Sequence, residues 1–139
     1  MNKSVERIYR DQKLIAIIFR KNLKVNELEF FTDDKNPFQL GAHNRKRGVK
    51  LAPHVHKLKK PITVNTLQEW LFVTRGKILI TIYTPKGHII NKKTLSTGDS
   101  ILLMEEGHGV DFLEDSIIFE IKQGPFINTV HSKIFLNKL

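Results

Sequence analysis

The stretch Lys77-Ile-Leu-Ile-Thr-Ile-Tyr83, set between the turns Arg75-Gly76 and Pro85-Lys86-Gly87, decides the fold class. It is apolar on both faces, which predicts a strand that is covered on each side. Similar short apolar runs recur between glycine and proline turns in both directions along the chain. They are Val5–Tyr9, Leu14–Phe19, Val49–Val55, Leu67–Val73, His88–Leu95, Ser100–Met104, Val110–Leu113 and Ser116–Lys122. No segment sustains helical periodicity, so we expect an all-β sandwich or antiparallel barrel with little helix.

The chain has the length of one domain. Its 139 residues are enough for a single hydrophobic core, and there are no internal repeats or linkers. We therefore expect one domain over residues 1–139, with its core at about 40–125 and N-terminal strands in 5–31. The tail, 127–139, is expected to pack on the barrel or to pair with a second subunit.

The composition indicates in which cellular compartment the protein is expected. The chain has no cysteine, which excludes disulfides and thiolate metal ligands, so any metal must be held by nitrogen and oxygen. The first thirteen residues are mostly polar and charged and have no apolar signal core, and the apolar run Leu14–Phe19 is far shorter than a membrane span. We expect a cytoplasmic protein that does not enter membranes.

The chain is strongly basic, with a formal net charge of +9 and a pI of about 9.9. Such a charge favours anionic partners. Nucleic acid is not expected, because neither aromatic–basic interleaving nor a recognition-helix pattern is present. The clusters Arg45-Lys46-Arg47 and Lys57 with Lys59-Lys60 flank a histidine pair. They form either a solvated basic surface or an entrance that attracts a small anionic or sugar ligand, such as a phosphorylated or nucleotide-linked sugar.

Three histidines and one carboxylate are the candidate metal ligands. In an extended segment, residues i and i+2 point to the same side, so His54 and His56 can direct two imidazoles at one point. His108 lies between Gly107 and Gly109, which suits a tight backbone with an exposed ring. Together with Glu69 these histidines would form the ligand shell of one divalent metal ion.

Glu69 is assigned to this site by the alternation of its neighbours. Leu67, Leu71 and Val73 occupy the same parity and are all apolar, so Glu69 is expected on an inward, mostly apolar face. An ionised carboxylate is costly in such surroundings unless a positive charge meets it, and a metal ion supplies that charge.

The spacing of these residues resembles the two motifs of the cupin family. Five residues separate Gly48 from His54-Val-His56, and six separate Glu69 from Gly76, as in the first motif. The second motif is similar to the segment from Gly98 to Gly107-His108. The chain departs from the family in the twelve residues between His56 and Glu69, in Met104 at the position of the motif's proline, and in lacking an asparagine after His108. The resemblance implies an antiparallel jelly-roll (cupin) β-barrel with a metal held by His54, His56, Glu69 and His108.

A narrower resemblance concerns small single-domain cupins associated with polysaccharide and lipopolysaccharide biosynthesis. It rests on Gln68-Glu69, Gly107-His108-Gly109 and Glu120-Ile-Lys-Gln-Gly-Pro125. This resemblance implies a carbohydrate or nucleotide-sugar ligand. Cupins often dimerise through strand exchange, so it also implies a homodimer.

Three functions remain open. Three histidines and a carboxylate leave coordination positions free and accept Zn, Mn, Fe, Ni or Co. A Lewis-acid metal ion would support isomerisation or epimerisation of a sugar. An iron(II) centre would support a dioxygenase, and a non-catalytic sugar-binding or regulatory barrel is the third alternative.

Glu120 and Lys122 are the candidate catalytic residues. The segment Ser116–Lys122 alternates between an apolar face and a face that carries these two charges. They form either a solvent-facing pair or part of the barrel mouth beside the metal. In the second case burial would raise the pKa of the glutamate and lower that of the lysine, which suits acid–base work.

Overall fold

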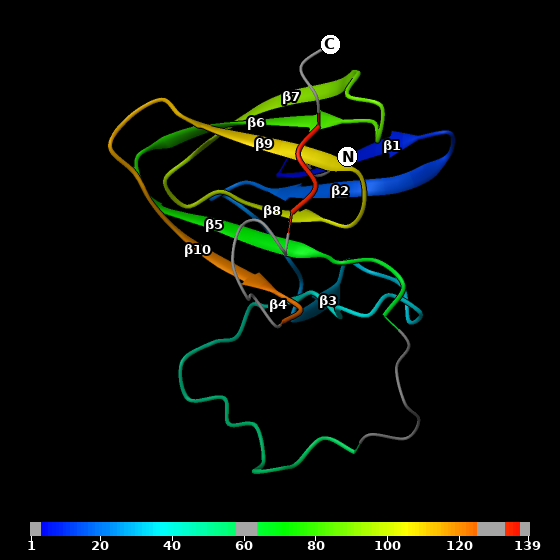
Figure 1. Ribbon diagram of the computed structural model, residues 1–139. Coiled ribbons are helices and arrows are strands. Elements are labelled where there is room, and N and C mark those ends of the chain that lie inside the picture. The colour runs from blue at the N-terminus through cyan, green and yellow to red at the C-terminus, as the bar shows by residue number, and fades with distance from the viewer. Residues whose placement is uncertain (1–3, 58–63, 125–132, 137–139) are drawn as a thin grey trace. The chain divides into compact units, whose positions relative to one another are not determined.

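The computed structural model describes residues 4–57, 64–124 and 133–136. Within these ranges the protein is all-β, with antiparallel pairing throughout and no helix (Figure 1). The expected all-β class with antiparallel strands is therefore confirmed. The described part has no helix with the length and hydropathy that a membrane span needs. The strands are β1 (Val5–Arg10), β2 (Lys13–Phe19), β3 (Leu28–Phe30), β4 (Gly41–His43), β5 (Glu69–Arg75), β6 (Lys77–Tyr83), β7 (Ile89–Ser96), β8 (Ser100–Leu103), β9 (Gly107–Phe112) and β10 (Ile117–Lys122).

The chain divides into two compact units. The major unit comprises Met1–Leu23 and Thr66–Leu139, and the minor unit comprises Lys24–Asn65. Of the strands in the described residues, β3 and β4 belong to the minor unit and the others to the major unit.

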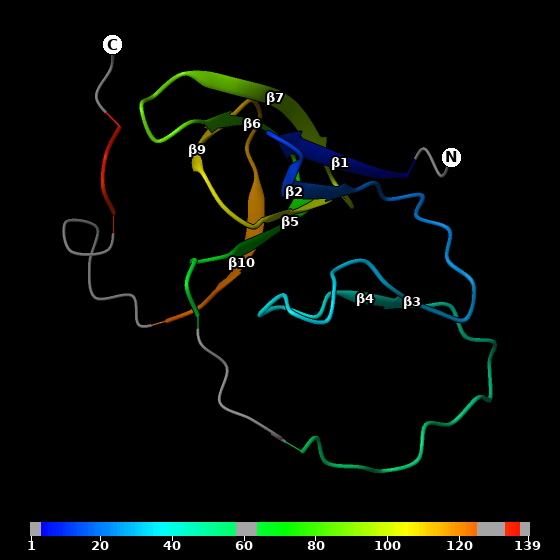
Figure 2. The same ribbon diagram turned by 90° about the vertical axis from the view of Figure 1, so that its right-hand side faces the viewer.

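The major unit contains two sheets in two layers. One sheet has the order β1-β2-β8-β5-β10 and the other the order β7-β6-β9. Figures 1 and 2 both show the three-stranded sheet lying over the five-stranded one. Neither sheet closes on itself within the described residues, so a closed barrel is not seen there.

Two strand pairs of the major unit are nested in sequence, β6 with β9 inside β5 with β10. After β7 the chain turns at Thr97-Gly98, where Gly98 has a φ of +90°. It then returns through β8, β9 and β10, so that β9 pairs with β6 and β10 pairs with β5. β8 pairs with β2 and β5 rather than with β7, so the segment from β5 to β10 crosses repeatedly between the two sheets.

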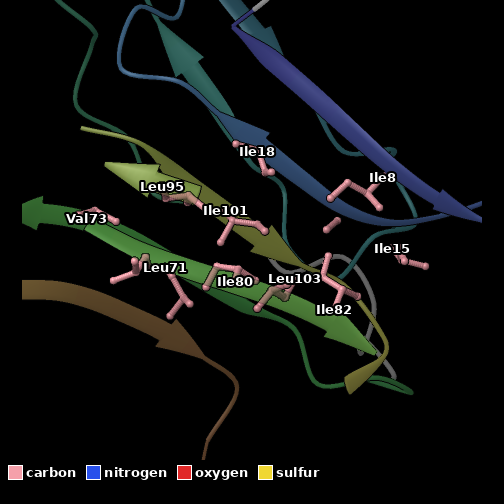
Figure 3. Packing of buried hydrophobic residues seen from close by; sticks show 12 residues of the cluster. Ile8, Ile15, Ile18, Leu71, Val73, Ile80, Ile82, Leu95, Ile101 and Leu103 are labelled. Atoms are coloured by element: carbon pink, nitrogen blue, oxygen red, sulfur yellow. The ribbon is translucent and has the colours of Figure 1, made fainter. Parts of the chain in front are cut away.

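The core lies between the two layers. Isoleucine and leucine side chains from both sheets meet there (Figure 3). Leu71 and Val73 are buried from β5, while Ile80 and Ile82 are buried from β6. Burying one such side chain contributes about 1.5–3 kcal/mol, so this cluster is the main source of the unit's stability. We call the two sheet faces that meet here the inner faces.

A salt-bridge network joins the two sheets beside this core. Arg20 follows β2, and its guanidinium donates to Glu6 at 2.7 Å, to Asp99 at 3.0 Å and to the Thr94 carbonyl of β7 at 2.8 Å. Lys93 of β7 donates to the other oxygen of Glu6 at 2.8 Å. Strands from both layers therefore share these charged groups.

The minor unit is built on one pair of short strands, β3 and β4. Thr32 holds the loop between them, because its hydroxyl donates to the Phe38 carbonyl and accepts from the Leu40 amide. The predicted strand Val49–Val55 is wrong, since residues 49–57 form no strand. Pro53 lacks the amide hydrogen that a ladder needs, which explains this failure. Residues 58–63 and most of the expected tail, 127–139, lie outside the described residues.

Candidate functional site

Glu69 is the first residue of β5, and its side chain is on the inner face. It alternates with the buried Leu71 and Val73, and only 17% of its side chain is exposed. The predicted inward position of Glu69 is therefore confirmed. Leu67, expected on the same face, is 68% exposed because the strand begins after it.

His108 reaches Glu69 from the opposite sheet. It pairs in register with Ile82 of β6, a core residue, so its side chain lies on the inner face. Its Nε2 lies 3.5 Å from Oε2 of Glu69, and 29% of its side chain is exposed. Two of the four predicted ligands are thus brought together across the two layers at a partly open position.

His54 and His56 belong to the minor unit. Both are exposed, and their ring centroids lie 4.9 Å apart with the rings at 74°. Nδ1 of His54 lies 2.8 Å from the Ala52 carbonyl. A carbonyl only accepts hydrogen bonds, so Nδ1 is the donor in this contact. The predicted proximity of the two rings holds, although the strand expected to carry them does not form.

The predicted set of four ligands is only partly assembled. Among residues 4–57, 64–124 and 133–136, no group of three or more histidine or acidic side chains is positioned to hold a metal ion. The histidine pair and the Glu69–His108 pair lie in different units. The shared ligand shell therefore stays a prediction from the sequence.

Lys122 lies beside Glu69 on the neighbouring strand. The two residues are directly opposite each other in the β5–β10 register. The Lys122 ammonium bonds to Glu120, which raises the pKa of Lys122 above its ordinary value, and the charge of Glu69 raises it further. This direction is opposite to the lowered pKa expected for a buried lysine, because the neighbouring carboxylates outweigh desolvation. Lys122 is therefore a persistent cation.

The carboxylate of Glu69 is held in its ionised form. Burial raises the pKa of Glu69, but the contact with His108 and the charges of Lys122 and Lys133 lower it by more. The net pKa of Glu69 lies below its ordinary value. The site thus combines an anionic oxygen, an imidazole nitrogen and nearby cations.

The loop that precedes His108 is fixed by ion pairs that the sequence analysis did not foresee. Glu106 has a φ of +80°, a left-handed conformation that is unfavourable for a residue with a side chain. Arg10 donates to both of its carboxylate oxygens at 2.6 Å, and Lys13 bonds to Glu105. Glu106 and Arg10 are 96 residues apart, so no local pattern could have revealed this contact.

Gly107 and Gly109 allow close packing around the histidine. A Cβ on Gly107 would lie 2.6 Å from the Leu136 side chain, and one on Gly109 would lie 3.4 Å from the Tyr83 ring. Neither glycine has a positive φ. The two glycines therefore leave room for the neighbouring Leu136 and Tyr83 side chains, and neither uses the left-handed conformation that only glycine adopts freely.

Comparison with known proteins adds no identification. No family model matches the chain, and no curated protein or solved structure matches it either. The function must therefore be argued from the site itself.

Proposed function

We propose that this protein binds an anionic carbohydrate or nucleotide-sugar intermediate at the Glu69–His108 pair, with one divalent metal ion as cofactor, and catalyses isomerisation or epimerisation. The observation that carries this proposal is the 3.5 Å approach of Glu69 and His108 across the two layers, beside the cationic Lys122. A carboxylate and an imidazole held together at a partly open end of a core are typical of a binding or catalytic site.

The proposed fold is the jelly-roll of cupins. Its support is the nested pairing of β5 with β10 and of β6 with β9, which is the order expected for a long hairpin rolled into two sheets. The cupin resemblance assigns Glu69 and His108 to the metal ligands of this fold.

The two donors fit a metal ion in spacing and chemistry. Ligands bonded at 2.0–2.2 Å to a tetrahedral ion lie about 3.3–3.6 Å apart. The 3.5 Å between Nε2 of His108 and Oε2 of Glu69 agrees with this separation and is long for an ordinary hydrogen bond. The remaining ligands are assigned to His54 and His56 by the sequence alone.

The metal ion, Lys122 and Glu120 would each have a separate role in the reaction. A bound divalent ion would supply a Lewis acid that polarises a substrate carbonyl. Lys122, which keeps its charge, would bind a phosphate or carboxylate of the substrate. Glu120, hydrogen-bonded to Lys122, would accept the proton from the adjacent carbon.

Metal binding is tested by elemental analysis of protein purified without chelator. We expect about one divalent ion per chain, and we expect Glu69→Gln and His108→Asn to lower the metal content at least tenfold. His88→Asn is the matched control, because His88 is an exposed histidine in the β6–β7 turn. Unchanged metal content in both site variants would remove the metal from the proposal.

The reaction class is tested separately. Candidate nucleotide sugars and sugar phosphates are first ranked by the rise in melting temperature that they cause, which should shrink with added salt. The best ligand is then incubated with the protein in D2O and followed by NMR. Incorporation of deuterium into the ligand at the carbon next to its carbonyl would support proton transfer at that carbon. Oxygen consumption with iron(II) would instead indicate the dioxygenase, and binding without turnover would indicate a sugar-binding protein.

A further inference from the structure

Residues 133–136 are the described part of the C-terminal tail, and they belong to the major unit. They form no strand, and the side chains of Ile134 and Phe135 are 95% and 70% exposed. Of these four residues only Leu136 is partly buried. The segment therefore has little packing of its own, and Leu136 is the residue that can hold it against the rest of the unit.

Leu136 contacts β9 beside the candidate site. A Cβ on Gly107, the first residue of β9, would lie 2.6 Å from the Leu136 side chain, so this leucine fills the space that the glycine leaves. Neighbouring residues of a strand point to opposite faces, and His108 is on the inner face, so Leu136 lies on the outward face of β9. The tail segment thus reaches the strand that carries His108.

Lys133 extends the same segment to the Glu69 side of β9. Three peptide links separate it from Leu136, so the Cα atoms of the two residues lie at most about 11 Å apart. β9 is the last strand on its side of the sheet in the described part of the chain, which leaves its edge open for a segment to pass. Burial raises the pKa of Glu69, the contact with His108 lowers it, and the charge of Lys133 lowers it further. The segment therefore passes from the outward face of β9 round its edge to the mouth of the site.

The ammonium group of Lys133 is accessible to a ligand. Its side chain is exposed, and it acts on Glu69 through its charge without a hydrogen bond. Lys122 bonds to Glu120, whereas Lys133 has no carboxylate bonded to it among the described residues. Glu69 thus has cations from two separate segments near it, β10 and the tail. Two such cations can bind two anionic groups of one ligand.

We propose that Lys133 is a specificity-determining residue, which binds the second phosphate of a nucleoside diphosphate sugar while Lys122 binds the first. This role rests on the proposed function, from which the anionic ligand and the role of Lys122 are taken. A diphosphate presents two neighbouring anionic groups, whereas a sugar monophosphate presents one. Hydrogen bonds between an ammonium group and phosphate oxygens are charge-assisted and therefore strong. Two lysines at the mouth of the site thus favour the diphosphate.

Isothermal titration calorimetry of the full chain tests this role. The probes are UDP, dTDP, GDP, CDP and ADP, each compared with its own monophosphate. For the nucleoside that binds best, the wild type should bind the diphosphate about tenfold more tightly than the monophosphate. Lys133→Gln should reduce this preference about fivefold, because it removes one of the two cations. Lys133→Arg keeps the charge and should retain the preference.

The contact of Leu136 is tested by a substitution that leaves the lysine in place. Leu136→Ala removes the side chain that fills the space beside Gly107, and it should lower the diphosphate preference about threefold, because Lys133 is then less firmly positioned. Ile134→Ala is the matched control, since this side chain is 95% exposed, and it should leave the preference unchanged. Lys86→Gln removes an exposed lysine of the β6–β7 turn and controls for the loss of net charge.

The outcomes distinguish this role from the proposed function. Equal binding of diphosphate and monophosphate by the wild type, an unchanged preference in Lys133→Gln, or an equal loss in Lys86→Gln would overturn the role of Lys133 and leave the ligand class standing. A wild type that binds none of these nucleotides would overturn both this role and the nucleotide-sugar ligand. Circular dichroism of each variant should show the wild-type spectrum, so that a lost preference is not a loss of folding.

Discussion

At the scale of single residues, backbone conformation and local space decide what each position tolerates. Gly48 and Gly76 have the same φ of +89°, yet their surroundings differ. A Cβ on Gly76 would lie 2.2 Å from the Ser116 hydroxyl and 2.6 Å from the Asp115 carbonyl, while a Cβ on Gly48 would meet nothing within 4 Å. The two glycines therefore separate the cost of a left-handed backbone from the cost of a steric clash.

We predict that Gly76→Ala lowers the free energy of unfolding by about 3 kcal/mol or more, and that Gly48→Ala lowers it by about 1 kcal/mol. Both variants force alanine into a left-handed conformation, but only the first also drives a methyl group into the backbone at Asp115. Urea denaturation measures both values. Equal losses would show that the β5–β6 turn moves away from Asp115 and Ser116 at little cost.

At the scale of elements, the β1–β2 hairpin has the turn geometry that suits a hairpin, but its turn residues are not those that this geometry favours. Asp11 and Gln12 have φ values of 47° and 66°, which is the pattern of a two-residue type I′ turn. Such turns prefer glycine at the second position, because side chains are strained at positive φ.

We predict that Gln12→Gly stabilises the protein by about 0.5–1 kcal/mol, since glycine adopts this φ without strain. Arg7→Gly is the control, because it places the same residue at an exposed position inside β1 and should cost about 0.5–1 kcal/mol. Chemical denaturation compares the two. A loss of stability in Gln12→Gly would mean that the turn imposes no strain on glutamine.

At the scale of the whole major unit, the network around Glu6 and Arg20 couples the two sheets and makes stability depend on pH. Burial raises the pKa of Glu6, but the hydrogen bonds from Lys93 and Arg20 lower it by more, so its pKa in the folded protein is below the ordinary value. A lowered folded pKa means that the contribution is complete above the unfolded pKa of about 4.3 and is lost as the pH falls through the folded pKa.

We predict that Glu6→Gln lowers the free energy of unfolding by about 1 kcal/mol at neutral pH, and that the difference from wild type disappears in acid. Denaturation from about pH 3 to about pH 7 measures this difference. Glu29→Gln, at an exposed position of β3, is the control and should follow the wild-type pH profile. A difference that persists at low pH would show that shape, rather than charge, accounts for the effect.

The sequence by itself determined the elements that depend on local pattern. Short apolar runs between turns predicted the hairpin of β1 and β2 and the strands β6 and β10, because alternation and turn residues act within a few positions. Parity along β5 placed Glu69 on the inner face for the same reason. The sequence pattern failed at Val49–Val55. The apolar residues there suggested a strand, but Pro53 has no amide hydrogen for the hydrogen bonds between strands.

Only the tertiary structure decided the rest. The approach of His108 to Glu69, the Arg10–Glu106 ion pair and the division into two units depend on contacts between distant parts of the chain. The pKa of Lys122 rises because two carboxylates lie beside it, although a burial argument from sequence predicts the reverse. Periodicity reports which face a residue takes, but which residues meet across two sheets is set by how those sheets pack.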